Sequence, residues 1–495
     1  MLDSDSPRRT RRSIVFAGAL ISMFMAAVEQ TIVATSLPTI IAELGGFRVF
    51  SWVFAIYLLT QGASIPIYGK LADVYGRKRV YFAGAAIFLI GSALAGLSGS
   101  MLQLILFRAL QGIGAGSIVS VPLTMMGDIY SAEERARVQG YLSSVWGVAS
   151  VIGPAIGAFL VEHVGWQYVF WLNLPLGIVA IAIFAFYLHE DPKQRAHAID
   201  YLGTFLFLAG LMALMLALIQ GTSLPWAAVA ALLAVAILCL ALFYRIERRA
   251  SEPTVPLAHF RNRIISVSGL GQFATGAVMI GVTTFVPTYV QGVMGGTPIV
   301  AGFALAAMSI GWPISSLVCG RLMAVASFRL NAALGSATLV AGAALLAALD
   351  PSRGPVFAGL GAFVIGLGMG FTNTTYTVAA QSSVEWHERG IATSLNLFMR
   401  NIGQALGAAM FGAILNFGIA RELTGDPNIL NRLMEPALRR AIAPAHLAEL
   451  IHAIAASLHV VYLIAAAIAV AAFLIALRLP PGHNARSARP GSIQA

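Results

Sequence analysis

Charged residues are scarce in this chain. Only 11% of its 495 residues are Asp, Glu, Lys or Arg, and 58% are hydrophobic. A globular domain carries about 25% charged and about 45–50% apolar residues. So little charge does not cover a soluble surface. The composition therefore predicts a polytopic membrane protein whose surface mostly faces lipid.

Several motifs for other functions are also missing. The two cysteines, Cys239 and Cys319, lie in separate apolar segments without a CxxC spacing, and no two histidines form an HxxxH pair. We therefore expect no disulfide and no metal site. No GxxxxGK[ST] motif is present, which disfavours a primary pump driven by ATP. The net charge of +10 comes from short basic clusters between apolar runs, so we expect no nucleic-acid partner.

Long apolar runs dominate the chain instead. A spanning helix needs about 20 mostly apolar residues, and the lipid interior tolerates no exposed irregular backbone. The sequence therefore predicts an all-α polytopic fold with fourteen transmembrane helices. The expected spans are 14–40, 50–69, 80–98, 102–126, 138–160, 167–188, 200–220, 225–244, 265–289, 299–323, 330–349, 355–379, 391–416 and 456–478.

Lysine and arginine are divided unevenly between the two sides. Of these residues, 23 lie in the tails and alternate loops of one side, and six lie in the opposite loops. The positive-inside rule places the richer side in the cytoplasm. We therefore expect a multi-pass protein of the inner (plasma) membrane with both termini cytoplasmic, which requires an even number of spans.

An internal repeat relates the two ends of the chain. Sliding the sequence by 254 residues places GIGAG (112–116) on GLGMG (366–370) and Gly153 on Gly407. Two related membrane halves around a central cavity are typical of a transporter. The expected parts are a cytoplasmic tail (1–13), an N-terminal six-helix bundle (14–190), an inserted helix pair (199–245), a C-terminal six-helix bundle (262–478) with an outer loop (417–455), and a cytoplasmic tail (479–495).

The stretch GKLADVYGRKRV (69–80) follows the second expected span. It is consistent with a simple positive-inside loop, but its order of residues resembles the signature loop of the major facilitator superfamily. The resemblance implies a conformational latch in which Asp73 faces a helix N-terminus and Arg77 pairs with Asp128. The latch would hold the two halves together in one state and break in the other. Its expected residues are Gly69, Asp73, Gly76, Arg77 and Asp128.

The fourth span contains Arg108 in LILFRALQGIGAGS (104–117). The glycines do not indicate a nucleotide site, because no strand precedes them; Gly112 and Gly116 instead form a GxxxG packing face. Arg108 could extend passively toward the outer boundary. The family resemblance implies the other role, since Arg-x-x-x-Gly matches the proton-transfer motif of the superfamily.

The fifth span contains GVASVIGPAIGA (147–158). A helix interrupted by proline and rich in glycine is consistent with a kinked packing helix. The pattern also resembles the antiporter motif of exporters in this superfamily, although Gly157 is followed by Ala158 where the motif usually has a second glycine. The residues that carry this motif are Gly147, Gly153, Pro154 and Gly157.

Glu29 lies near the middle of the first span, in VEQTIVATSLPTI (28–40). An ionisable residue there costs about 2.5–3.5 kcal/mol on insertion scales, and the simpler alternative is a neutral structural glutamate. The stretch resembles the helix-1 motif of 14-helix drug:proton antiporters, which usually has Asp at this position. The resemblance implies that Glu29 and Arg108 couple transport to protons. The same carboxylate would also pair with a cationic drug.

Arg400 is a third charge deep in a span, and its role is open between balancing Glu29, binding an anionic substrate and bonding to backbone. Other polar and aromatic side chains are candidates for a substrate cavity, although aromatics more often pack or anchor at interfaces. The full cavity set is Trp52, Tyr57, Gln61, Trp146, Asn373, Tyr376, Asn396 and Arg400.

These features predict a proton-driven exporter of amphipathic, cationic compounds rather than an enzyme. The proton gradient would supply the energy without a cofactor. The expected partners are the lipid bilayer, the small-molecule substrate and protons; the sequence identifies no periplasmic adaptor. One alternative is an exporter of the same fold with a dedicated substrate, such as a siderophore, a lipid or an osmolyte. Another is a non-transporting membrane sensor. The outer loop 417–455 is expected to hold an amphipathic or short helical segment at the outer surface.

Overall fold

A computed structural model describes residues 10–130, 132–190, 200–221, 223–250, 253, 255–323, 325–385, 388–422, 433, 439–440 and 442–481. Within these residues the chain is almost entirely helical. The N-terminal part contains α1 (Arg12–Leu44), α2 (Ser51–Tyr75), α3 (Arg77–Gly96), α4 (Met101–Ile129), α5 (Ala132–His163), α6 (Gln167–Trp171) and α7 (Asn173–Tyr187). The later part contains α8 (Tyr201–Ile219), α9 (Trp226–Glu247), α10 (Arg263–Thr288), α11 (Pro298–Leu322), α12 (Phe328–Ala347), α13 (Gly354–Ser382), α14 (Arg389–Glu422) and α17 (Pro444–Ala476).

The helices match the predicted spans one for one. Thirteen helical stretches in the described residues are long and apolar enough to cross a membrane, with α6 and α7 together forming one of them. The 32-residue α5 occupies the place of the remaining predicted span. The prediction of an all-α fold with fourteen transmembrane helices is therefore confirmed.

The outer loop is shorter than predicted. The sequence places it over 417–455, but α14 continues to Glu422 and α17 already begins at Pro444. Proline at the start of α17 lacks only an N–H that has no partner within the helix anyway. The segment from Pro444 is therefore the beginning of the last spanning helix. Most of 423–441 lies outside the described residues.

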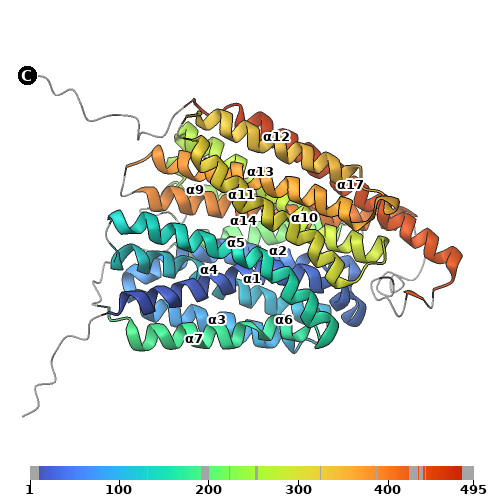
Figure 1. Ribbon diagram of the computed structural model, residues 1–495, viewed down its shortest axis with the longest axis horizontal. Helices are drawn as coiled ribbons and strands as arrows, with labels where there is room; N and C mark the ends of the chain where they lie inside the picture. The colour runs from blue at the N-terminus through green and yellow to red at the C-terminus, as the bar shows by residue number, and fades with distance from the viewer. Residues whose placement is uncertain are drawn as a thin grey trace, which may run out of the picture.

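The spanning helices form two bundles that lie side by side (Figure 1). Helices α1 to α7 make one half, and α10 to α17 make the other. The halves meet mainly where α2 packs against α14 and α5 packs against α11. The pair α8 and α9 packs against itself, and α8 also contacts α14 and α2.

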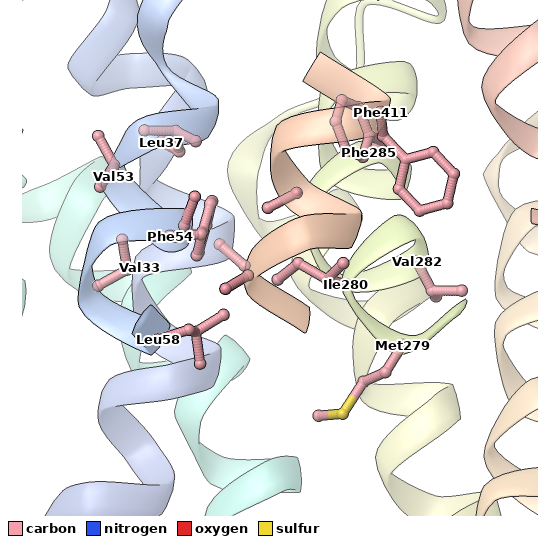
Figure 2. Packing of buried hydrophobic residues seen from close by; sticks show 14 of the residues in the cluster. Val33, Leu37, Val53, Phe54, Leu58, Met279, Ile280, Val282, Phe285 and Phe411 are labelled. Carbon is pink, nitrogen blue, oxygen red and sulfur yellow. The ribbon is translucent and has the colours of Figure 1, made fainter. Parts of the chain in front are cut away.

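A hydrophobic core joins the halves (Figure 2). Figure 2 shows Phe54 and Leu58 of α2 on one side of this core and Ile280 of α10 on the other. Toward the ends of these helices, the ring of Phe285 lies 5.9 Å from that of Phe50 and 6.0 Å from that of Phe411. Edge-to-face aromatic pairs at such distances stabilise contacts beyond their buried area.

Three hydrogen bonds also cross between the halves at the end of the molecule away from the start of α1. Gln291 Nε2 donates to the carbonyl of Thr35 at 3.3 Å. Asn416 Nδ2 donates to the carbonyl of Arg48 at 2.6 Å. The backbone N–H of Ile299 donates to Glu162 at 3.2 Å. Together with the aromatic core, these bonds close the two halves at this end, which corresponds to the predicted outer side.

At the opposite end the halves separate. A Cβ at Gly62 of α2 would lie 3.3 Å from Cβ of Asn401 of α14. Gly69 lies on the same face about two turns further along, yet among the described residues no heavy atom lies within 4 Å of a Cβ placed there. Gly302 of α11 packs on α5. Gly320 lies on the same face of α11 about five turns further along, and no described heavy atom lies within 4 Å of a Cβ placed there. The structure is therefore closed at one end and open at the end that holds the start of α1.

Candidate functional site

Glu29 and Arg108 form an ion pair inside the N-terminal half. Glu29 lies on α1 and Arg108 on α4, and the Arg108 guanidinium donates to Glu29 Oε1. Both side chains are 0% exposed. Because an unpaired charge at this depth costs several kcal/mol, each residue stabilises the other there. The structure thus brings together the two residues predicted to couple transport to protons.

The Arg108 side chain makes further contacts, although its second terminal nitrogen is buried without a partner among the described residues. The terminal nitrogen that donates to Glu29 also donates to Gln111 Oε1 at 2.7 Å, and Nε donates to the carbonyl of Val53 at 3.2 Å. The guanidinium lies 4.0 Å from the ring centroid of Tyr57, a favourable cation–π geometry. These contacts direct Arg108 inward, so it does not extend toward the membrane boundary.

Three residues of this network, Ser92, Gln111 and Asn173, were missed by the sequence analysis. Asn173, at the start of α7, donates to Glu29 Oε2 at 2.5 Å and to Ser92 Oγ at 2.9 Å. Gln111 donates to the same Ser92 oxygen at 3.1 Å. Neutral Ser and Asn side chains within apolar runs carry no distinctive signal. Only the spacing of Gln111 three residues after Arg108, on one helix face, could have indicated a partner.

The network encloses Glu29 among helices of a single half. The other members of the network come from α3, α4 and α7, and all of them are buried. In this conformation a cationic compound between the halves does not reach the carboxylate. The predicted direct pairing of Glu29 with a drug is therefore not present in this state. What the site does provide is a carboxylate paired with a buried guanidinium, both enclosed within the N-terminal half.

The glycines of the fifth span lie beside this network. A Cβ at Gly153 would lie 3.5 Å from the carbonyl oxygen of Val28, next to Glu29, and one at Gly157 would lie 2.8 Å from that of Ile32. The carbonyl of Pro154 in turn faces Gly302 of the other half, 3.0 Å from a Cβ placed there. This segment thus packs α5 closely on both α1 and α11. Gly147 and Trp146 lie on α5 outside the residues whose side chains the structure describes.

The predicted latch residues meet at the open end of the N-terminal half. Arg77 contacts Asp128 of α4 and lies 3.4 Å from Asp73. Gly76 adopts φ +89°, a left-handed conformation that favours glycine at the turn from α2 to α3. The helices that these contacts join, α2, α3 and α4, all belong to one half. In this conformation the cluster therefore lies within one half, and the prediction that it holds the two halves together in one state stays a prediction.

The acid at the N-terminus of α3 is Glu190 rather than Asp73. Its two carboxylate oxygens accept hydrogen bonds from the backbone N–H groups of Arg77 at 2.8 Å and Lys78 at 2.9 Å. Lys78 Nζ in return donates to the carbonyls of Ala185 and Leu188 at the end of α7. A carboxylate at a helix N-terminus satisfies free N–H groups and complements the helix dipole. Glu190 thereby connects α7 to the signature loop.

Arg400 lies in the other half and does not balance Glu29 in this state. It is on α14 and is 8% exposed. Its terminal nitrogen donates to Asn373 Oδ1 of α13 at 3.4 Å, and Gln272 of α10 donates to the same oxygen at 2.9 Å. Asn373 and Arg400, both predicted as cavity residues, are therefore linked, while Gln272 is a partner that the sequence analysis did not identify.

Comparison with known proteins decides the family. The model of the Major Facilitator Superfamily matches residues 19–201 and 191–408, which is well over half of the chain. This chain belongs to the major facilitator superfamily. It is therefore a multi-pass membrane transporter, as the residues of its signature loop indicated.

The similar proteins within this superfamily include multidrug transporters. Multidrug transporter protein MdtP of Bacillus subtilis (strain 168) is 35% identical over 424 residues, covering 85% of this chain and 78% of the relative. Multidrug resistance protein 3 of the same organism is 32% identical over 486 residues, covering 94% of both chains. The predicted resemblance to the multidrug efflux type is thereby confirmed.

Solved structures show the same fold. A bacterial homologue of the human lysosomal transporter Spinster, in an inward-facing and unoccupied conformation, superposes with a TM-score of 0.65 at 16% sequence identity, covering 96% of this chain and 98% of that one. A point mutant of the nucleoside transporter NupG gives a TM-score of 0.62 at 14% identity, covering 94% of this chain and 99% of that one. At these identities the comparison establishes the architecture alone.

The remaining predicted cavity residues of this major facilitator are mostly enclosed. Trp52 and Tyr376 are buried. Gln61 accepts a hydrogen bond from Gln30 at 3.3 Å, and Asn396 donates to the backbone carbonyl of Tyr376 at 3.2 Å. The aromatic members thus mainly pack. The polar members lie on α2, α13 and α14, the helices around the junction of the two halves.

Proposed function

We propose that this transporter exports amphipathic, cationic compounds across the plasma membrane in exchange for protons, with both termini in the cytoplasm. The observation that carries the proposal is the buried pair of Glu29 and Arg108, the one place in the described helices where a carboxylate lies far from the helix ends. Such ionisable residues within a membrane are typical of proton relays. The names of the relatives as multidrug transporters support the range of compounds.

The proton acts by changing the charge balance of the pair. When Glu29 takes up a proton, Arg108 is left buried without its counter-ion, which is strongly unfavourable. A shift of α1 relative to α4 relieves this cost. Since α1 also packs against α5 and contacts α10 and α11 of the other half, the shift reaches the interface at which the halves separate. Outward release of the compound, return of the halves and loss of the proton to the cytoplasm complete an alternating-access cycle.

The energy source in this proposal is the proton gradient, with no bound cofactor. The partners are the lipid bilayer, the exported compound and protons. The closed end of the structure is the outer side, and the open end, which holds the start of α1, faces the cytoplasm. The described state would therefore be the one that receives compounds from the cytoplasm or the inner leaflet.

Everted membrane vesicles with an imposed proton gradient test the proposal. Vesicles with native protein should accumulate ethidium. Glu29→Gln should abolish the accumulation driven by the gradient, because the Gln side chain does not bind or release a proton. Glu43→Gln is the matched control: Glu43 lies on the same helix but accepts from Trp166 near the closed end, so transport should persist.

Two results would contradict the proposal. Equal transport by native protein and Glu29→Gln would make Glu29 structural. Folded native protein that moves no cationic dye would exclude multidrug export and favour the dedicated substrate that the fold equally allows. Screening of single compounds from the siderophore, lipid and osmolyte classes would then follow.

A further inference from the structure

Arg400 is a buried cation with little to satisfy it. It is more than nine-tenths buried, and its hydrogen bond to Asn373, at 3.4 Å, is long for a charged donor. Its Nε has no hydrogen-bond partner among the described residues. Enclosing a guanidinium so poorly is unfavourable unless another group completes the site.

No acidic side chain of this half completes it. Helices α10, α11 and α13 contain no Asp or Glu within their bounds, and the acid of α14, Glu422, is the last residue of that helix. Glu29 in the other half is engaged with Arg108 and Asn173. The positive charge of Arg400 is therefore not matched by a carboxylate within the spanning part of its own half.

Neighbouring polar groups are unsatisfied as well. Gln272 Oε1, Thr275 Oγ1 and Gln404 Nε2 are buried and have no partner within the part of the chain that the structure describes. Gln404 follows Arg400 by four residues and so shares its helix face. Thr275 precedes Gly276, where a Cβ would lie 3.3 Å from Cα of Arg400. Since buried polar groups are normally paired, this cluster where α10, α13 and α14 meet resembles a polar site without its ligand.

The cluster lies toward the open end. Arg400 lies about 16 Å along α14 from Arg389, at 1.5 Å per residue. Asn373 is only partly buried. The adjacent Asn401 faces Gly62 of α2. Beyond Gly62, toward the start of α1, the two halves separate. A compound entering between the halves therefore meets this side of α14 before it reaches the closed end.

We propose that Arg400 binds a carboxylate of the transported compound, so that the substrates include amphipathic molecules with both an amine and a carboxylate. This inference rests on the proposed export function and specifies its substrate class. The planar guanidinium matches a carboxylate with two parallel hydrogen bonds. The amides of Asn373, Gln272 and Gln404 surround the bound group with further donors and acceptors.

Two dyes that differ in a single group test this assignment. Rhodamine 110 carries a free carboxylate, and rhodamine 123 is its methyl ester. Transport of each into everted vesicles is measured for native protein, Arg400→Gln and Arg400→Lys. The matched control is Arg421→Gln, because Arg421 lies on the same helix but is exposed near its far end.

Native protein and Arg421→Gln should transport both dyes. Arg400→Gln should lower rhodamine 110 transport at subsaturating dye by about ten- to hundredfold, the range expected for hydrogen bonds to a charged group. Rhodamine 123 transport should persist, and it also shows that the variant is folded. Arg400→Lys should restore part of the rhodamine 110 transport, because lysine keeps the positive charge but does not form two parallel hydrogen bonds to a carboxylate.

Three outcomes would overturn the assignment. Equal loss of both dyes in Arg400→Gln and Arg400→Lys would make Arg400 structural. Unchanged rhodamine 110 transport in Arg400→Gln would show that the carboxylate binds elsewhere. Native protein that moves rhodamine 123 but not rhodamine 110 would refute carboxylate recognition while leaving cation export intact. Failure of native protein to move either dye would instead overturn the proposed export itself.

Discussion

Leucine at Gly69 should block transport without destabilising the protein. In the described state no described atom lies within 4 Å of a Cβ placed at this position, so we expect this face to accommodate Gly69→Leu here. Leucine also favours a helix over glycine by about 0.5–1 kcal/mol. The thermal midpoint of purified protein should therefore not fall.

The cost arises in the opposite state, when the open end closes. Ser51 lies against Gly412, and Gly62 lies against Asn401. Because α2 and α14 run antiparallel, the same register places Gly69 opposite Ser394, which is exposed here. If the helices close to the spacing seen at Gly62, where even a Cβ would lie 3.3 Å from its neighbour, a leucine side chain does not fit.

Overpacking of this kind costs about 1–3 kcal/mol, which lowers the population of the closed state by about five- to more than a hundredfold. Ethidium transport in everted vesicles should fall by a similar factor. Gly127→Leu is the control, since Gly127 is equally open but lies on α4, which packs mainly within its own half. Native-like transport by Gly69→Leu, or a clear drop in its thermal midpoint, would refute the reasoning.

Three further substitutions test other contacts. Glu190→Ala removes the acceptor at the start of α3 and should cost about 1 kcal/mol of stability, seen as a lower thermal midpoint; an unchanged midpoint would mean that water replaces it fully. Asn416→Ala removes the bond to the carbonyl of Arg48 and should increase labelling of a cysteine placed near the closed end; unchanged labelling would show that the apolar core alone keeps that end closed. Hydrogen bonds from the side chain and backbone of Ser352 hold the pKa of Asp350 below its usual value. The stability that Asp350 contributes should therefore be present above about pH 4 and lost as pH falls through its folded pKa, and a thermal midpoint with the same acid dependence in Asp350→Asn would contradict this.

The number and order of the helices could be predicted from the sequence because lipid imposes strict rules. A spanning segment must be long, apolar and internally hydrogen-bonded, and all the expected segments meet those conditions visibly. Charges inside such segments are equally conspicuous, which is why Glu29, Arg108 and Arg400 were identified. The end of the outer loop was not, because the first residues of α17, from Pro444, extend a helix beyond the apolar run that defines a span.

The contacts between distant residues could not be predicted in the same way. Glu190 reaches an N–H group 113 positions earlier in the chain, and nothing in its own surroundings indicates that partner. Asn173 and Ser92 are neutral, so each changes the mean hydropathy of its span only a little. The family resemblance implies that the latch joins the two halves in one state of the transport cycle. The structure shows a single state, and in it Arg77 and Asp128 belong to the same half.

The network around Glu29 draws every one of its described hydrogen-bonding side chains from the N-terminal half, and the unsatisfied polar cluster around Arg400 lies wholly in the other. A mutation in α10, α13 or α14 therefore replaces none of the described side chains that form hydrogen bonds in the network around Glu29. Under the proposed function, residues that contact the compound can therefore change while the pair of Glu29 and Arg108 stays the same. The division between the halves would thus let the range of exported compounds change separately from the residues proposed to couple transport to protons.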